Sequence, residues 1–299
     1  MNTLRRTLMM DHLLRNYAPI PAAAWRQIDD EAKSRLTPRL AARRLVDWSG
    51  PHGWGYSAVN LGRIASVGTT PPGTKTDMVV AQQRRVLALS EFKVSFSVEV
   101  SGLEDAERGA VDVDYADLDR AACDAALIEN RAIFHGWPDA GITGIVEASV
   151  HPAVTVGKID DYPQAIAQAT DTLRQAGIQG PYCLAINPQE YTNILASTEH
   201  GGYPLAEHLS RILGGDLVRA PGLDGALVVS KRGGDFLLDV GQDFAIGYTS
   251  HNAEQVTLYL EESFSFRVTE PQAAVVLTLA GSASSTSESQ QDMSTGSPN

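Results

Sequence analysis

The chain has 299 residues, of which 43% are hydrophobic and 20% are charged, a composition typical of a globular protein with a sizeable core. Its formal net charge of −12 argues against a general nucleic-acid-binding protein. No run of about 20 apolar residues occurs, so the sequence predicts no membrane-spanning helix. The first residues lack the apolar core of a signal peptide, and the two cysteines, Cys123 and Cys183, lack a zinc-binding spacing. We therefore expect a cytoplasmic protein with both cysteines as buried thiols.

The charge is unevenly distributed along the chain. Residues 1–50 carry nine Lys and Arg against five Asp and Glu, a net charge of +4, which leaves −16 for residues 51–299. Two interpretations remain open. The basic stretch either binds an acidic neighbour, including another copy of the chain, or is the solvated face of a helix.

The first element in chain order is an amphipathic helix predicted over residues 22–36, between prolines that mark its entry and Pro38 after its end. Its apolar side chains are spaced three and four residues apart: Trp25, Ile28, Ala32 and Leu36. A short strand is predicted at residues 43–48, where it is broken by Ser49, Gly50 and Pro51.

Residues 50–85 are rich in glycine and proline and leave room only for two thin strands, at residues 60–67 and 78–89. This excursion has little apolar material to form a core of its own. Long excursions of this kind in compact proteins are usually functional or bound to a partner.

A strand and a long helix follow. Residues 92–100 alternate apolar and polar side chains, which predicts a half-buried strand. Residues 114–135 form the longest predicted helix, capped by Asp112 or Asp114 and ended by Gly136. The narrow, alanine-rich apolar stripe of this helix predicts close packing against a sheet.

The second half of the chain mixes helices and strands. Asn187 is expected to cap a helix, with Glu190 returning to the cap amide. Two further helices are predicted at residues 160–176 and 204–213. Strands are predicted at residues 182–186, 217–220, 226–230, 236–240, 244–248, 256–268 and 274–279. Residues 281–299 contain seven serines and no aromatic residue, which is typical of a disordered tail.

A search for chemistry finds no common catalytic or nucleotide-binding motif: GxGxxG, GxxxxGK[ST], HExxH and GxSxG are all absent. The carboxylates of residues 112–119 lack the pattern of a calcium loop and are better explained as helix caps. His200 and His208, with Glu199 and Glu207, form the nearest approach to a cluster. They are either a metal or acid–base site or, as we expect, a solvated loop and helix end. No catalytic residue, metal site or cofactor is predicted.

Several short motifs, in order and with their spacing, resemble the encapsulins, bacterial and archaeal shell proteins once grouped with linocin-type bacteriocins. The resemblance covers residues 17–279. Its motifs are Ala18-Pro19-Ile20 followed by Trp25, Ile28 and Asp29, Arg43-Arg44-Leu45-Val46-Asp47, Gly50-Pro51-His52-Gly53-Trp54, residues 104–109, residues 129–136, Gly141-Ile142-Thr143-Gly144, Gly180-Pro181-Tyr182, residues 200–205, residues 231–248 and residues 258–266.

The resemblance implies an α+β fold of the Hong Kong 97 phage major-capsid type. Its peripheral domain is expected to comprise residues 1–49, 86–138 and 228–280. Residues 50–85 are expected to form an extended loop that pairs with a neighbouring subunit, residues 139–227 an axial domain, and residues 281–299 a disordered tail.

Site residues also follow from the resemblance. Leu36, Arg43, Asp47 and Ile246 match the patch that binds the C-terminal targeting peptide of a cargo enzyme. An alternative for Arg43 and Asp47 is that they only hold the fold together. Glu199, His200, Gly201 and Gly202 match the loop that lines a pore. A tryptophan that stacks a flavin in some relatives is absent, since this neighbourhood reads Ser101-Gly102-Leu103, and we expect no flavin.

The resemblance implies a self-assembling, non-enzymatic shell of about sixty copies that encloses a cargo enzyme and protects against oxidative stress or stores iron. The cargo is expected to be a dye-decolourising peroxidase or a ferritin-like protein, with the peroxidase favoured. Two alternatives are an enzyme, as a hydrolase or a secreted bacteriocin, and the major capsid protein of a prophage. Neither a nucleophile–base pair nor a scaffold or protease region is visible in the sequence.

Overall fold

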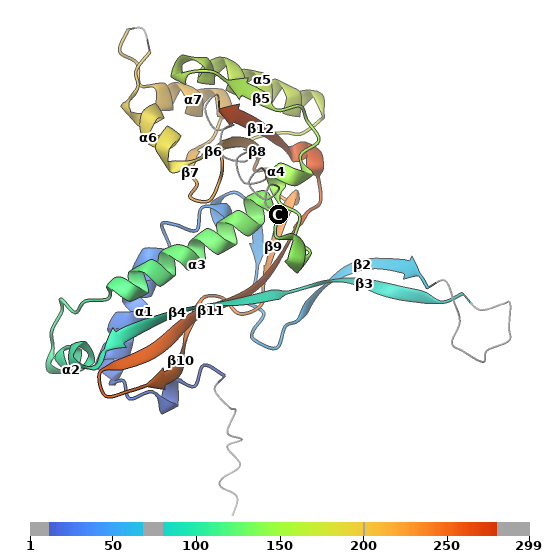
Figure 1. The fold of residues 1–299 in the computed structure, drawn as a ribbon. Helices are drawn as coiled ribbons and strands as arrows, with labels where there is room; N and C mark the ends of the chain where they lie inside the picture. Colours follow the sequence, from blue (N-terminus) through green and yellow to red (C-terminus); the bar gives the residue numbers. More distant parts are fainter. Residues whose placement is uncertain (1–11, 68–79, 200, 280–299) are drawn as a thin grey trace, which may run out of the picture.

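Two five-stranded sheets, one above the other in Figure 1, form the body of the protein, and a two-stranded arm projects from it. The computed structural model describes residues 12–67, 80–199 and 201–279. One continuous cluster of buried hydrophobic side chains runs through both sheets and their helices. Within these described ranges, no helix is both long and apolar enough to cross a bilayer.

The first sheet is built around strand β11 (Gln255–Val268), which pairs on one side with β4 (Ser90–Glu99). On its other side, β10 (Ala245–His251) and β9 (Phe236–Val240) lie end to end, both antiparallel to β11. A short strand, β1 (Asp47–Ser49), runs parallel to β9. The β9–β10 edge confirms that residues 231–248 contain two strands separated by a turn.

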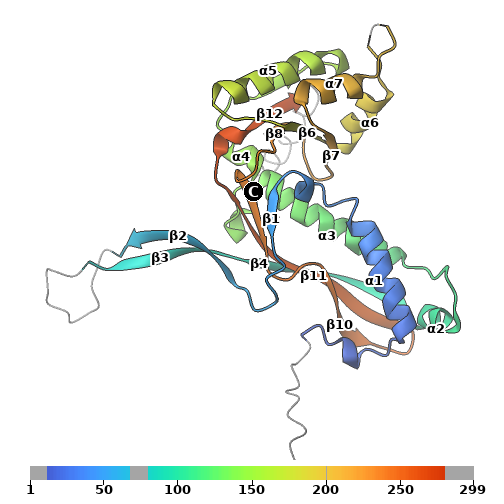
Figure 2. The same cartoon turned by 180° about the vertical axis from the view of Figure 1, so that it is seen from behind.

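Helix α3 (Ala116–His135) packs on β4 and β11, and α1 (Ala22–Leu36) lies against α3 (Figure 2). The predicted bounds of α1 are confirmed, and so is the packing of the alanine-rich stripe of α3 against a sheet. Of the two candidate caps of α3, Asp114 is the one that accepts a hydrogen bond, from the Ala116 amide at 2.9 Å.

The second sheet has the order β5-β12-β8-β6-β7. Its strands are β5 (Val154–Val156), β12 (Ala274–Leu279), β8 (Ala226–Ser230), β6 (Tyr182–Ile186) and β7 (Leu217–Arg219). Helices α4 (Ile145–Ala148), α5 (Tyr162–Gln175), α6 (Pro188–Ala196) and α7 (Leu205–Leu213) complete this half of the molecule. All five residues of β6 and of β8 are buried, as their unbroken apolar runs predict.

The sheet pairing differs from the predicted division of the chain. Residues 228–280 were expected to belong with the first sheet, but β8 and β12 pair with each other inside the second. β8 is buried at every position and β12 at Ala274, Val275 and Leu277, as expected of strands inside a covered sheet. The boundary expected at residue 227 therefore falls within a strand.

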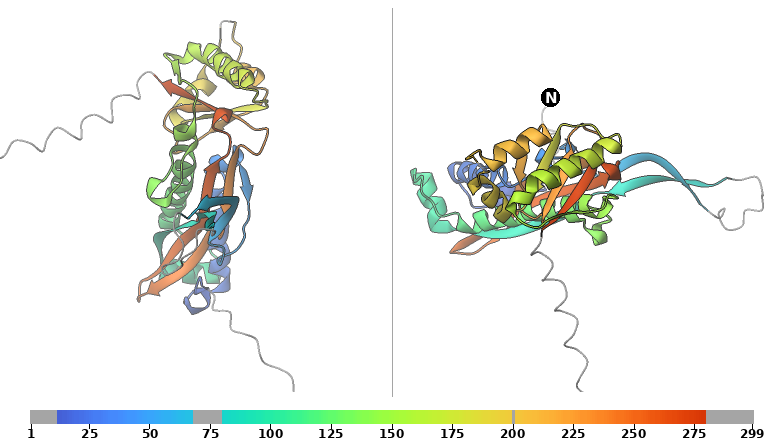
Figure 3. Two further views of the ribbon diagram at one scale, coloured as in Figure 1. Left: turned by 90° about the vertical axis from the view of Figure 1, so that its right-hand side faces the viewer. Right: turned by 90° about the horizontal axis from the view of Figure 1, so that it is seen from above.

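The arm consists of β2 (Ala58–Ser66) and β3 (Gln82–Ala88), which in the described part of the chain pair only with each other. Figures 1 and 3 show it extending sideways, away from both sheets. Most of its side chains are exposed, and the apolar Ile64 and Val86 are 58% and 55% exposed. Both strands are shorter or shifted relative to the predicted ones, and residues 68–79 of the predicted excursion lie outside the described residues.

Four local predictions need correction. The strand predicted at residues 43–48 begins only at Asp47, because Ala42–Arg44 form a 3-10 turn (η2) whose Ala42 amide donates to Asn130 Oδ1 at 3.0 Å. Helix α2 (Val100–Arg108) was not predicted, although Val100, Leu103 and Ala106 have helical spacing.

The other two corrections concern a cap and a thiol. Asn187 Oδ1 caps α6 by accepting from the Glu190 amide at 2.9 Å, but the Asn187 amide donates to Gly225 O rather than to Glu190. Cys183 is buried as expected, whereas Cys123 is only half-buried because it lies toward the outer side of α3.

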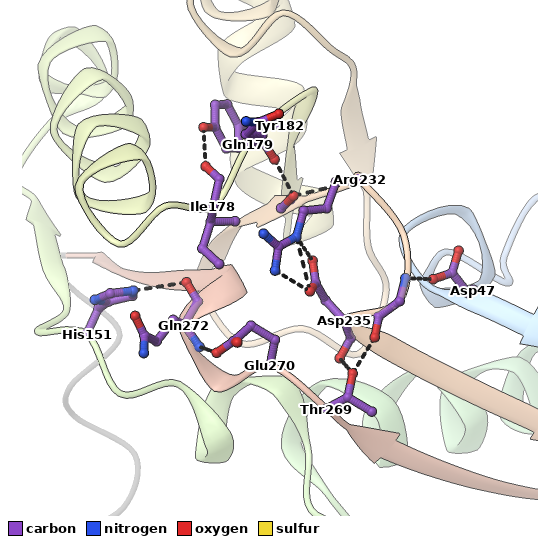
Figure 4. A network of polar contacts seen from close by, with 12 residues as sticks. Asp47, His151, Ile178, Gln179, Tyr182, Arg232, Asp235, Thr269, Glu270 and Gln272 are labelled. Atoms are coloured by element: carbon purple, nitrogen blue, oxygen red, sulfur yellow. Dashed lines mark hydrogen bonds and ion pairs between the residues drawn. The ribbon is translucent and has the colours of Figure 1, made fainter.

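Figure 4 shows how the two chain crossings between the sheets are tied together. Arg232 donates to both carboxylate oxygens of Asp235, with Nη2 at 2.8 Å from Oδ1 and Nε at 2.9 Å from Oδ2. The Thr269 hydroxyl and amide both donate to Asp235 O, at 2.9 and 2.8 Å. The Thr269 bonds join the β8–β9 crossing to the β11–β12 crossing, while the Arg232–Asp235 ion pair braces the first of these crossings internally.

We predict that Gly144→Ala destabilises the subunit by about 1–3 kcal/mol, because a Cβ at this position would lie 2.2 Å from the backbone nitrogen of Gly136. This contact joins the end of α3 to the start of α4, and backbone atoms on both sides leave no room for adjustment. Denaturant unfolding of the dissociated subunit measures the change. Gly55→Ala is the matched control, since a Cβ there would meet no atom within 4 Å. Equal stability of the two variants would contradict the prediction.

Candidate functional site

A groove of about 470 Å³ lies between α1 and β10, on the first half of the molecule. Its apolar lining comes from two segments far apart in the sequence. Leu36 and Leu40 belong to α1 and the turn after it, and Phe244, Ala245 and Ile246 belong to the turn before β10 and to β10 itself. The amphipathic face of α1 and the side of the sheet where Ile246 pairs with Leu260 together give the groove an apolar floor.

Three of the four residues predicted to bind cargo line this one groove: Leu36, Arg43 and Ile246. Leu36 and Ile246 are almost fully buried, at 6% and 3% exposure, so they form its floor rather than its rim. Asp47 is not part of the groove. Its carboxylate accepts a hydrogen bond from the Gly234 amide, which connects β1 to the crossing between the sheets (Figure 4).

Arg43 lies at one end of the groove, with its guanidinium directed into the protein. Nε donates to Glu129 Oε2 at 2.8 Å, and Nη2 donates to Glu262 Oε1 at 2.6 Å and to Asp243 Oδ1 at 2.8 Å. The rings of Trp48 and Phe244 each lie 5.3 Å from the guanidinium carbon. This arrangement favours a structural role for Arg43 over a direct charge contact with a guest.

Glu129 and Glu262 are unusual because both are fully buried, at 0% exposure. Burial alone would lower the pKa of Arg43, but the charges and hydrogen bonds of Glu129, Glu262 and Asp243 outweigh it and raise the pKa of Arg43 above its ordinary value. Burial, followed by the charge of Glu129, raises the pKa of Glu262 well above its ordinary value, and Arg43 only partly opposes this.

Sequence reasoning missed both glutamates, although each leaves a readable signal. Glu262 occupies an inward position on β11, in register with Leu258, Leu260 and Phe264. Glu129 falls within the apolar stripe of α3, four residues after Ala125. A carboxylate in an inward register predicts a buried partner of opposite charge.

The charges along the rest of the groove are mostly paired. Arg15 forms an ion pair with Asp29 at 2.7 Å and lies 3.9 Å from the Trp25 ring centroid. Lys33 is exposed on the rim and forms no ion pair among the residues that the structure describes. An apolar floor with one unpaired cation at its edge can bind an extended peptide through small apolar side chains and a polar or acidic neighbour.

The loop with the predicted pore residues lies at the top of the second half of the molecule, far from the groove (Figure 1). The Glu199 amide donates to Tyr203 O at 2.8 Å and the Gly202 amide donates to Glu199 O at 2.9 Å. Gly201 and Gly202 have φ of 105° and 81°, which residues other than glycine rarely adopt, so this tight turn requires both. His200 lies outside the described residues.

Glu199 and His208 do come together, with Glu199 Oε1 2.6 Å from His208 Nδ1. They form a pair rather than a metal site: in residues 12–67, 80–199 and 201–279, no three His, Cys, Asp or Glu side chains are placed to hold a metal ion. The pair anchors the loop to α7.

We predict that Arg43→Ala lowers the free energy of unfolding by about 3–5 kcal/mol, because it leaves buried carboxylates without their cation. Arg108→Ala is the control, since Arg108 pairs with Glu104 and Asp105 at the surface, where such pairs contribute about 0–1 kcal/mol. Denaturant unfolding of the dissociated subunits compares the two variants. A loss below about 1 kcal/mol for Arg43→Ala would show that the cluster is not a structural centre.

Comparison with known proteins identifies the family. Residues 10–265 match the family described as "Encapsulating protein for peroxidase". The Type 1 encapsulin shell protein of Rhodospirillum rubrum is 44% identical over 270 residues, which cover 90% of this chain and 96% of that protein. The Type 1 encapsulin shell protein of Brevibacterium linens is 43% identical over 272 residues, which cover 90% and 100%.

Among solved structures, a virus-like particle from Pyrococcus furiosus matches with a TM-score of 0.58 at 18% identity, covering 85% of this chain and 99% of that one. A chain of a structure titled "Mycobacterium phage Bobi" matches with a TM-score of 0.54 at 15% identity, covering 81% of this chain and 91% of that one. These two likenesses show the fold, which is the α+β fold of the Hong Kong 97 phage capsid type. The sequence matches show the family, and the chain is therefore a member of the encapsulin shell proteins, which are structural proteins and not enzymes.

Proposed function

We propose that the chain assembles into a closed shell of about sixty copies and that the groove between α1 and β10 binds the C-terminal targeting peptide of an enclosed enzyme. The observation that carries the proposal is the groove itself, which brings Leu36 and Ile246 together in one apolar floor. Both residues match positions of the family's docking patch, and neither contributes to a reaction centre.

The arm supports the assembly. β2 and β3 expose Ile64 and Val86 beyond the body, and an isolated two-stranded ribbon is at best marginally stable in water. Contact with a neighbouring copy covers these side chains and pairs the free strand edges. The three arginines of the arm, Arg63, Arg84 and Arg85, suit a neighbour whose net charge is negative.

The proposed cargo is a dye-decolourising peroxidase, and the proposed role is protection against oxidative stress in the cytoplasm. The family description supports a peroxidase. A ferritin-like cargo that stores iron is the alternative, and iron recovered with the purified shells would favour it. We also propose that Glu199, Gly201 and Gly202 line an opening through which small substrates pass.

Size-exclusion chromatography and negative-stain electron microscopy of the purified protein test the assembly. Uniform hollow particles are the expected result, whereas a particle of single-subunit mass contradicts the proposal. Nuclease-resistant DNA inside the particles would favour the prophage capsid instead, since that alternative shares the fold. Mass spectrometry of proteins that co-purify with the particles identifies the cargo.

We predict that Thr37→Trp strongly reduces cargo loading without preventing assembly. Thr37 is exposed at the edge of the groove, one residue after Leu36, and an indole ring there covers part of the space proposed for the guest. Ser34→Trp, at an exposed position of α1 outside the groove, is the matched control.

Cargo loading is measured as the mass ratio of guest to shell protein in co-expressed, purified particles. We expect a loss of at least about tenfold for Thr37→Trp, which corresponds to the removal of a binding contribution of about 1.4 kcal/mol or more. Ser34→Trp should load normally. Equal loading of both variants would mean that the guest binds elsewhere.

A further inference from the structure

We propose that Glu129 and Glu262 share one proton, and that this proton keeps Arg43 paired with Asp243 at the end of the α1–β10 groove. Loss of the proton at higher pH breaks the pairing and loosens the groove wall. We call this proton-dependent pairing of Arg43 with Asp243 the lock. The lock is independent of any guest, and only its consequence for cargo binding rests on the proposed function.

The geometry of the cluster favours a shared proton. Each glutamate directs one oxygen to Arg43, through Glu129 Oε2 and Glu262 Oε1. The other oxygens, Glu129 Oε1 and Glu262 Oε2, are buried and accept no hydrogen bond from any donor in the described residues. Glu129 Oε2 and Glu262 Oε1 lie 2.7 and 2.6 Å from the same atom, Arg43 Nη2, so the two carboxyl groups are neighbours and a proton on one can supply the missing donor for the other.

The charge balance leads to the same conclusion. Three carboxyl groups, Glu129, Glu262 and Asp243, surround the single cation Arg43. The other neighbours of Glu262 in the sheet are apolar, including its cross-strand partner Phe92 on β4 and Phe264 on β11. Ionising both buried glutamates is costly while one guanidinium serves all three groups.

Among the three carboxylates, Asp243 is the one held by a short turn rather than by a long helix or strand, so it can move most easily. Glu129 and Glu262 belong to α3 and to the central strand β11, which are held by continuous backbone hydrogen bonding. Asp243 lies in the turn between β9 and β10, and its side chain, at 35% exposure, is the only one of the three carboxylates that reaches solvent. A second negative charge on the glutamates draws Arg43 toward them, and Asp243 turns outward together with Phe244 of the groove wall.

The direction of the pH effect follows from the raised pKa of Glu262. A group whose folded-state pKa is raised stabilises the fold most below the ordinary pKa of glutamate, and that contribution is lost as pH rises through the raised pKa. The lock is therefore closed in acid and opens toward neutral and alkaline pH. Since one proton is released, the opening constant rises by at most about tenfold per pH unit.

Hydrogen–deuterium exchange of the assembled shell, read by mass spectrometry, tests the lock without any guest. Peptides covering residues 42–48 and 241–248 are followed between about pH 5 and pH 9, with exposure times scaled to the intrinsic exchange rate. In the unsubstituted protein we expect their protection to fall by up to about tenfold per pH unit over part of this range. Residues 182–186, in β6 of the second sheet, should keep constant protection.

Glu262→Gln removes the titrating proton. The amide of the new glutamine still donates to Glu129, and its carbonyl oxygen still accepts from Arg43. Hydrogen-exchange protection of residues 241–248 should therefore become independent of pH. Glu129→Gln should behave in the same way and serves if Glu262→Gln does not fold. Glu254→Gln changes the charge equally at an exposed position before β11 and should keep the original pH dependence. Constant protection in the unsubstituted protein, or an unchanged slope in both glutamine variants, overturns the proposal.

A second experiment tests the consequence of the lock for cargo binding. Loaded shells are washed at about pH 9, where we expect the unsubstituted shell to release guest several-fold faster than Glu262→Gln. If both shells release guest at the same rate while hydrogen exchange still depends on pH, the lock exists but does not control the groove. That result overturns the proposal that the lock regulates cargo binding. Failure to load at any pH contradicts the proposed function instead, while the exchange result still decides the lock.

Discussion

The ion-pair cluster around Arg43 is the interaction on which the first half of the molecule depends. One side chain from the short η2 turn joins α3 through Glu129, β11 through Glu262 and the β9–β10 turn through Asp243. Buried charges are costly unless they are paired and hydrogen-bonded, so removal of any member leaves the others uncompensated. The cluster therefore specifies where four separate segments meet, in addition to whatever it contributes to stability.

The position of the cluster also links stability to the groove. β9 and β10 lie end to end along one edge of β11, and the interruption between them places Asp243 and Phe244 where α1 passes. A continuous strand would present no turn for Arg43 to engage and no open end for the groove. The same break in the strand thus provides a contact for the buried cation and one wall of the proposed binding site.

The arm and the sheets differ in how their apolar side chains are covered. Both sheets are covered by helices and share one apolar core, whereas the arm has exposed apolar side chains and no core. Such an element is stable only where another surface covers it. A protein whose function is assembly can distribute its hydrophobic surface in this way, because the missing half of the core is supplied by the next copy.

The sequence by itself determined the local structure wherever the hydrophobic residues follow one clear pattern, either helical spacing or an unbroken apolar run. The bounds of α1, β6, β8, β9 and β12 follow from helical spacing or unbroken apolar runs, and the residues that match the encapsulins predicted the family and the α+β capsid fold. It also predicted Leu36 and Ile246 as neighbours in one site, through the resemblance alone. Local patterns record which face of an element is buried but not which partner covers it.

Only the tertiary structure decided the rest. That β8 and β12 belong to the second sheet depends on pairing between strands far apart in the sequence, which no local period records. The same holds for Arg43: its sequence neighbours predicted a short strand, but the buried carboxylates of Glu129 and Glu262 hold its segment in a turn. Asp47 joined the crossing between the sheets instead of the groove for a similar reason, since its partner, Gly234, lies far along the chain. The charge on a side chain is a property of the sequence, whereas its desolvation and its partners exist only after folding, and these decide whether it binds a guest or holds the protein together.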